Sequence, residues 1–219
     1  MYAIGKDEIV QIASWHQVQD ADQFEKDLNA MAQLIPTNKV RVALLGDGAG
    51  WVWRCMQKAF PQGRQILDYY HCSEHLHALA QAQYGENPDA ALAWVIGATG
   101  SIYYGETGQV IGGLKRMKPK NDDVKEQIRK LIVYLQNNKH RTRYADAKKG
   151  GYPIGSGGIE SANKFICHTR LKRSGAWWLK TNCNGMLRLR CSLVNGTFDE
   201  AFAKYVTRDQ AKQFLRTNA

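Results

Sequence analysis

The sequence predicts an α/β fold, and three observations support this prediction. Two short strand-like runs, at 40–45 and 65–70, are bounded by Gly, Pro or polar residues, as buried strands usually are. Each run leads into a stretch whose apolar residues recur at the spacing of one helix face. Strands that alternate with helices along a chain are typical of α/β sheets.

The N-terminal part predicts one strand and one helix before the first of these runs. Residues 9–15 (IVQIASW) have the composition of a strand. Asp22 and Glu25 have the spacing of a capping box, so a helix is expected to begin there. After the run at 40–45, the spacing of apolar residues predicts a second helix that begins near Ala49.

From the second run onward we expect mostly helices. The strand at 65–70 leads into a helix that extends to Tyr84. Residues 80–150 are interpreted as a helical segment with a glycine-rich stretch at 97–113. Further expected elements are a helix over 122–135, a flexible loop over 151–158, a helix that contains Glu160 and an amphipathic helix over 183–194.

The composition is that of an ordinary globular protein. The 219 residues are 44% hydrophobic and 23% charged, which suits a domain with a substantial core. No run of about 18 apolar residues is present, so we expect no membrane partner. The five cysteines include no CxxC pair, and the N-terminus lacks a secretory pattern. We therefore expect a cytoplasmic protein without a disulfide framework.

The charge is distributed unevenly. Residues 1–114 hold 7 Lys+Arg and 12 Asp+Glu, whereas residues 115–219 hold 23 and 8. A strongly basic second half suggests a polyanionic partner, and nucleic acid is the commonest one in the cytoplasm.

Three acidic residues are candidates for a metal site. Asp47 and Asp68 each end or follow a predicted strand, and Glu160 lies on a late helix. Phosphoryl transfer on nucleic acid uses divalent cations held by carboxylates, and such oxygen ligands favour Mg²⁺ or Mn²⁺. Other roles are open: Asp47 as a turn residue, Asp68 as a helix cap, and Glu160 as a first-turn residue favoured by the helix dipole.

A basic and aromatic stretch follows Glu160. Its cations are expected to face DNA phosphates. Trp177 and Trp178 are expected to lie in the core, since tryptophan is usually buried. The candidate nucleic-acid-binding residues are Lys164, His168, Arg170, Lys172, Arg173 and Lys180.

Two other motifs give alternatives. His71, Glu74 and His75 match H-x-x-E-H, an inverted zinc-protease signature whose third ligand would have to come from elsewhere. The glycines at 46, 48 and 50 suggest a dinucleotide-binding loop, but their pattern is GxGxG instead of GxGxxG. A dinucleotide site is also disfavoured because we expect no acidic residue at the end of a second strand at the required distance.

Four motifs in order carry a family resemblance. GDGAGWVW, ILDYYHCSEHL, PIGSGGIESANKFICHTRLKRSGAWW and MLRLRCSLVNG resemble the rear part of a bacterial insertion-sequence transposase of the ISKra group, which is related to Mutator elements. The resemblance implies a ribonuclease H-like mixed sheet flanked by helices, with a helical insertion before the catalytic glutamate. It implies a first part of the catalytic core at 1–80, the insertion at 81–150, and the rest of the core at 151–219.

The resemblance also implies roles for single residues. Asp47 matches the second catalytic aspartate of this D-D-E family and Glu160 its glutamate, and both would bind Mg²⁺ or Mn²⁺. Asp68 and His71 match a D-x-x-H pattern that supports the active site or the DNA. The partners would be the element ends and target DNA, with a possible homo-oligomer, in the cytoplasm at the nucleoid.

One departure from the family pattern concerns its first aspartate. That residue lies on a strand upstream of the part matched here, and Asp7, Asp20 and Asp22 are not in such a setting. We therefore expect this chain to lack the first strands and the first catalytic aspartate. The sequence leaves open an active transposase, its truncated fragment, or an inactive DNA-binding remnant.

Overall fold

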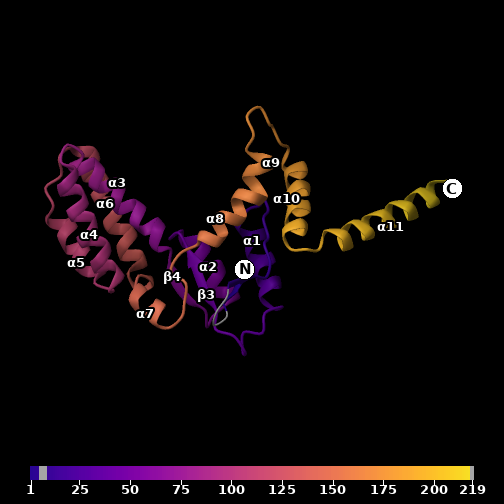
Figure 1. The fold of residues 1–219 in the computed structure, drawn as a ribbon, viewed down its shortest axis with the longest axis horizontal. Coiled ribbons are helices and arrows are strands. Elements are labelled where there is room, and N and C mark those ends of the chain that lie inside the picture. Colours follow the sequence, from indigo (N-terminus) through magenta and orange to yellow (C-terminus); the bar gives the residue numbers. More distant parts are fainter. Residues whose placement is uncertain (5–8, 218–219) are drawn as a thin grey trace. The chain divides into compact units, whose positions relative to one another are not determined.

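Helices make up most of the chain, and two short sheets complete it (Figure 1). The structure, a computed structural model, describes residues 1–4 and 9–217. It contains two units, which we name for their place in the sequence. Residues 21–156 form the central unit, and residues 1–20 with 157–219 form the terminal unit.

A parallel pair of strands organises the central unit. β3 (Ala43–Gly46) and β4 (Arg64–Leu67) pair in parallel. α2 (Gly50–Ala59) connects them, and α1 (Ala21–Ala32) packs against α2. One face of α2 buries Trp53 and Cys55. The predicted alternation of strands and helices is confirmed here, so this part of the chain is an α/β unit.

A series of helices follows β4. Their inward faces form one core with the sheet, in which Leu76, Ile102 and Leu135 are at most 1% exposed. Each such side chain stabilises the fold by roughly 1.5–3 kcal/mol. The helices are α3 (Tyr69–Tyr84), α4 (Pro88–Tyr103), α5 (Thr107–Arg116), α6 (Asp122–Asn138), a 3₁₀ turn (Lys139–Arg141) and α7 (Tyr144–Lys149).

The glycine-rich stretch at 97–113 is largely helical, in agreement with the helical segment predicted over 80–150. α4 runs through Gly97, and α5 runs through Gly108. A glycine inside a helix costs roughly 0.5–1 kcal/mol relative to alanine. Burial of Val110 and Leu114 on the inner face of α5 offsets this cost, because each buried side chain contributes more than one glycine removes.

The terminal unit combines both ends of the chain. β1 (Tyr2–Ile4) pairs antiparallel with β2 (Ile9–Gln11). One continuous helical segment consists of α8 (Gly157–Asn163), a π-helical turn (Lys164–His168) and α9 (Thr169–Leu171). α10 (Lys180–Val194) and α11 (Phe198–Thr217) follow.

The core of the terminal unit is small. Among the described residues, its buried hydrophobic side chains are Ala162, Ile166, Leu187 and Cys191. Hydrogen bonds add to it: the Ser14 N–H donates to Asn195 Oδ1 at 2.7 Å, and Asn195 Nδ2 donates to the Ser14 carbonyl at 2.9 Å. A unit with so few buried side chains depends on such polar contacts more than the central unit does.

Several predicted elements differ from the observed ones. The strand predicted at 9–15 is confined to Ile9–Gln11, and β1 and α11 were not predicted. The strand predicted at 65–70 ends at Leu67, because a helix begins directly after Asp68. Asp7, which the sequence analysis considered for the first catalytic position, lies outside the described residues.

The strands described form two separate two-stranded sheets. β1 and β2 belong to the terminal unit, whereas β3 and β4 belong to the central unit. The single mixed sheet that the resemblance implies would have to join these two pairs.

Candidate functional site

Asp47 and Asp68 follow the carboxyl ends of two paired strands. Gly46, the last residue of β3, lies opposite Leu67, the last residue of β4. The next residue on each strand is an aspartate, so the two positions are neighbours at one edge of the sheet. The sequence prediction that both lie at strand ends is confirmed. Ligands of α/β sheets collect at this edge.

Asp68 is the buried N-cap of α3. Its side chain is 3% exposed, and Oδ1 accepts hydrogen bonds from the backbone N–H groups of Tyr70 (2.8 Å) and His71 (3.1 Å). Oδ2 accepts one from the N–H of Ser156 at 2.7 Å. Both carboxylate oxygens are therefore engaged by backbone donors, as expected of a cap and not of a metal ligand.

Asp47 is exposed, unlike Asp68. Its Oδ1 accepts a hydrogen bond from the N–H of Ala49 at 3.0 Å, which is the geometry of a short turn. Gly48 follows with φ of 108°, a backbone conformation that favours glycine. The turn therefore holds the backbone after β3 and leaves the carboxylate accessible.

Tyr134, a residue that the sequence analysis missed, holds this turn. Its hydroxyl donates to the Asp47 carbonyl oxygen at 3.0 Å. Its ring packs so closely that a Cβ added at Gly48 would lie 2.6 Å from Tyr134 Cε2. Burial raises the pKa of the Tyr134 hydroxyl well above its usual range, so it remains a neutral donor. No local signal could have paired two residues so far apart in the sequence.

The two histidines of the H-x-x-E-H motif lie near the same turn. The ring centroids of His71 and His75 are 4.8 Å apart, and those of His75 and Tyr134 are 4.6 Å apart. Burial lowers the pKa of His75, and the neighbouring His71 lowers it further. Glu74 Oε2 lies 3.4 Å from His71 Nδ1. Glu74 therefore contacts His71, one of the two histidines that a zinc protease with this motif would use as ligands.

A polar cleft opens beside the turn. It has a volume of about 790 Å³ and is lined by Gly48, Gly50 and Trp53, by amide side chains and by basic ones, with no acidic residue among its lining. The guanidinium of Arg141 lies 4.5 Å from the centre of the Trp53 ring. Such a surface is suited to phosphate oxygens. Its basic residues are Arg54, Lys58, His140 and Arg141.

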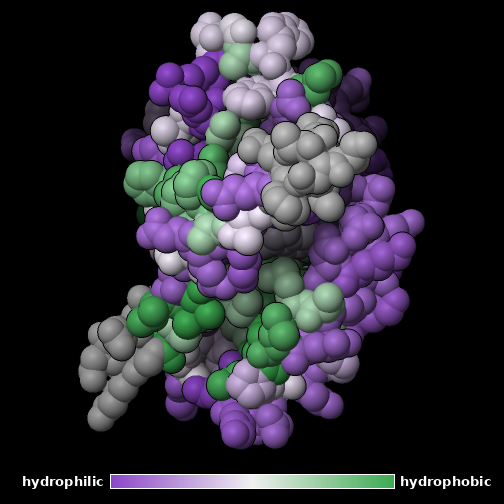
Figure 2. Space-filling model, turned by 90° about the vertical axis from the view of Figure 1, so that its right-hand side faces the viewer, coloured by the Kyte–Doolittle hydropathy of each residue, from purple (hydrophilic) through white to green (hydrophobic). Residues whose placement is uncertain are grey.

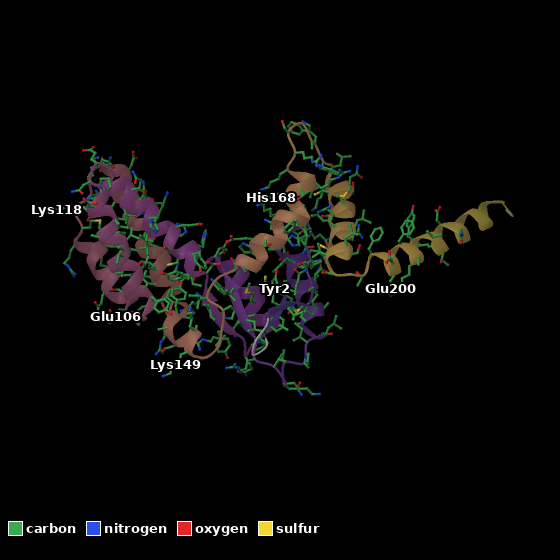
Figure 3. All side chains as sticks on the ribbon, in the orientation of Figure 1. Tyr2, Glu106, Lys118, Lys149, His168 and Glu200 are labelled. Atoms are coloured by element: carbon green, nitrogen blue, oxygen red, sulfur yellow. The ribbon has the colours of Figure 1, made fainter. Side chains whose placement is uncertain are left out.

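Glu160 and the predicted DNA-binding residues belong to the terminal unit. Glu160 is exposed in the first turn of α8, so its predicted place on a helix is confirmed. No ion pair among the described residues involves the predicted basic positions. All six are exposed, and Figure 3 labels one of them, His168: Lys164, His168, Arg170, Lys172, Arg173 and Lys180.

Two sequence predictions at this site are wrong. Trp177 and Trp178 are not core residues, because they are 96% and 37% exposed. In addition, an acidic residue does end a second strand after the glycine loop, since β3, α2 and β4 form a parallel unit and Asp68 follows β4. Its buried carboxylate is engaged by backbone N–H groups, so it cannot bind a ribose hydroxyl as a dinucleotide site requires.

The structure brings Asp47, Asp68 and His71 into one unit and places Glu160 in the other. Within residues 1–4 and 9–217, no three His, Cys, Asp or Glu side chains form a group that could hold a metal ion. The third ligand that the zinc-protease motif needs is therefore not among the described residues.

Comparison of the chain with protein-family models, with curated proteins and with solved structures gives no match. In the part of the chain that the structure describes, no helix has both the length and the apolar character needed to cross a bilayer.

Proposed function

We propose that this chain is a D-D-E transposase, or the rear part of one, that acts in metal-dependent cleavage and strand transfer of DNA. The observation that carries the proposal is the exposure of the Asp47 carboxylate. This carboxylate is exposed at a strand end beside a basic cleft, whereas the neighbouring Asp68 is fully engaged as a cap. The motif order of the insertion-sequence family adds support.

In this proposal Asp47 and Glu160 would supply carboxylate ligands to a divalent cation. Asp47 Oδ1 accepts one backbone hydrogen bond, and Glu160 is exposed on α8. Carboxylate oxygens from separate elements are the ligands that Mg²⁺ and Mn²⁺ take beside substrate phosphates. Such a cation would lower the pKa of an attacking water or hydroxyl and stabilise the charge that develops on the phosphate.

The other residues of the site have supporting roles in this proposal. Tyr134 and Gly48 fix the turn that presents Asp47, and Asp68 fixes the start of α3, which carries His71. The cleft would hold a phosphate of the DNA, and the basic residues of 164–180 would contact other phosphates. The ribonuclease H-like mixed sheet, a working homo-oligomer and a place at the nucleoid are parts of the same proposal.

The experiment is a strand-transfer assay with DNA that carries the element ends. Asp47→Asn removes a carboxylate charge without changing shape, so activity is expected to fall by more than the roughly 10- to 100-fold typical of residues that only support a metal ligand. Asp89→Asn, at an exposed aspartate in the first turn of α4, is the matched control and is expected to retain activity. Unchanged strand transfer in Asp47→Asn would overturn the assignment.

A second candidate is an inactive DNA-binding remnant. The observation that favours it is the lack of a complete metal-binding group among the described residues. A remnant would bind DNA in a salt-sensitive, sequence-indifferent manner and would not cleave it. Mn²⁺-dependent nicking by the purified chain, abolished in Asp47→Asn, would exclude this candidate.

A further inference from the structure

The loop between α9 and α10 exposes a tryptophan. Trp177 is 96% exposed, and Leu179 in the same loop is 72% exposed. A tryptophan buries roughly 150–250 Å² when it is covered, so leaving one in water forgoes a large stabilisation. Single exposed apolar residues are ordinary, so the exposure of Trp177 does not by itself indicate a ligand. The charges near this side chain do.

The backbone of the loop is a defined turn. The Ala176 N–H donates to the Arg173 carbonyl at 3.1 Å, and Gly175 between them has φ of 73°. At the start of the loop, the Lys172 N–H donates to the His168 carbonyl at 3.3 Å. The turn therefore sets the position of Trp177 directly after it.

The charged residues in the segment around Trp177 are almost all cationic. Residues 157–195 contain seven Lys+Arg and one acidic residue, Glu160. Lys180 begins α10, where a positive charge is unfavourable for the helix dipole, and no side chain caps this end of the helix. A polyanion at this position would remove the repulsion. Figure 2 shows one face of the molecule, on which strongly hydrophilic residues lie beside residues of intermediate hydropathy and beside hydrophobic ones.

Cations around an exposed aromatic ring are the combination that binds unpaired nucleic acid, in which the cations contact phosphates and the ring stacks on a base. A continuous duplex offers no free base face to such a ring. A membrane anchor would need a wide apolar helix face, whereas this loop has a run of four apolar residues, 176–179, followed by Lys180.

We propose that Trp177 stacks on an unpaired base of DNA, while Lys172, Arg173 and Lys180 contact the adjacent phosphates. The proposal deepens the transposase function and rests on it for the choice of DNA. Glu160 and the loop are joined by one continuous helical segment that ends at Leu171. From Glu160 to Leu171 the segment rises by roughly 17 Å, at about 1.5 Å per residue. The stacked base would therefore lie a few nucleotides from a phosphate held near Glu160.

The experiment compares binding of a labelled single strand and of the matching duplex, by fluorescence anisotropy, over a series of salt concentrations. Stacking of one base contributes about 1–3 kcal/mol, so Trp177→Ala is expected to weaken single-strand binding about 5- to 150-fold. Duplex binding is expected to change by less than about twofold, and the salt dependence should stay the same because no charge is lost.

Three variants complete the design. Trp177→Phe keeps a ring and is expected to restore most of the affinity. Leu189→Ala, at a 45% exposed apolar residue of α10 outside the loop, is the control and should bind as the wild type does. Lys172→Gln is expected to weaken both DNA forms and to reduce the slope of the salt dependence.

The outcomes separate this proposal from the proposed function. Equal losses on single strand and duplex, or no loss in Trp177→Ala, would overturn the stacking role even if strand transfer is confirmed. A loss of self-association or of binding to anionic lipid vesicles, without a change in DNA binding, would assign the loop to a second copy or to a membrane. If Trp177→Ala weakens single-strand binding in a protein that does not cleave DNA, the stacking proposal is supported and the transposase function is excluded.

Discussion

The hydroxyl of Tyr134 donates a hydrogen bond to the carbonyl oxygen of Asp47 at 3.0 Å. This contact links the helical segment to the turn after β3, because Tyr134 lies on α6 and Asp47 follows the strand. A tyrosine on a helix thereby fixes the backbone of the residue that we propose as a metal ligand. Four predictions follow from this and related contacts of the central unit.

Tyr134→Phe removes the hydroxyl and keeps the ring that packs on Gly48. We expect the free energy of unfolding to fall by about 0.5–1.5 kcal/mol, the usual value of one hydrogen bond. Strand transfer should fall by more than this loss explains, with a higher Mn²⁺ concentration needed for half-maximal activity, because Asp47 is held less firmly. Tyr104→Phe, at a 74% exposed tyrosine, is the control. Equal effects of the two variants would argue against a positioning role.

Gly48→Ala should destabilise the protein, and Gly97→Ala should stabilise it. Gly48 has φ of 108°, and an added Cβ would lie 2.6 Å from Tyr134 Cε2, so we expect a loss of more than about 1 kcal/mol. Gly97 lies inside α4 with no atom within 4 Å of an added Cβ. There alanine should add about 0.5–1 kcal/mol. Urea denaturation of both variants measures the difference, and a shift of the same sign in both would contradict the observed turn.

Asp68→Ala should cost more stability than the loss of an ordinary helix cap. Asn121, the exposed N-cap of α6, accepts one hydrogen bond from the Val124 N–H at 2.9 Å, so Asn121→Ala should cost about 1 kcal/mol. Asp68 is buried and also accepts from the Ser156 N–H. Its removal leaves further buried donors unpaired, which adds about 1–3 kcal/mol. Equal losses of the free energy of unfolding in the two variants would show that the bond to Ser156 contributes nothing.

His75 should make the protein less stable in mild acid. Burial lowers its pKa in the folded state below the usual 6.5, so between the two values the unfolded chain binds more protons than the folded one. Stability from this group is therefore complete above about pH 6.5 and decreases as the pH falls toward the folded-state pKa. We expect a lower urea midpoint at about pH 5.5 than at about pH 8, and a smaller difference in His75→Gln. An unchanged difference in the variant would exclude His75 as the cause.

Local signals in the sequence located the main elements of the site. The aliphatic run before Gly46 predicted a strand end at Asp47, although β3 begins at Ala43 and not at Val40. The role of Asp68 as a cap was one of two predicted alternatives, and its hydrogen bonds show that it is the cap. In both cases the signal lies within a few residues of the position that it predicts, so one strand or one helix start contains all the information needed.

Other features required contacts between distant segments. Composition predicted a buried Trp177, and this expectation failed. Burial of the inner face of α5 outweighs the cost of its glycines, and only the packed unit shows which face that is. Trp177 follows the turn at Gly175 and is 96% exposed, although hydrophobicity alone predicted burial.

The sequence by itself determined the two strands of the central unit, the aspartate that follows each and the basic character of the second half. The spacing of apolar residues, the turn residues and the charge are properties of short segments, so they can be recognised without knowledge of the fold. The tertiary structure decided that the Asp68 carboxylate is buried with both oxygens bonded and that the Asp47 carboxylate is exposed. The first depends on Ser156, and the turn that holds the second depends on Tyr134. Hydrogen bonds between segments far apart in the chain exist only after the helices have packed, and the pattern of residues around Asp47 or Asp68 contains no trace of them.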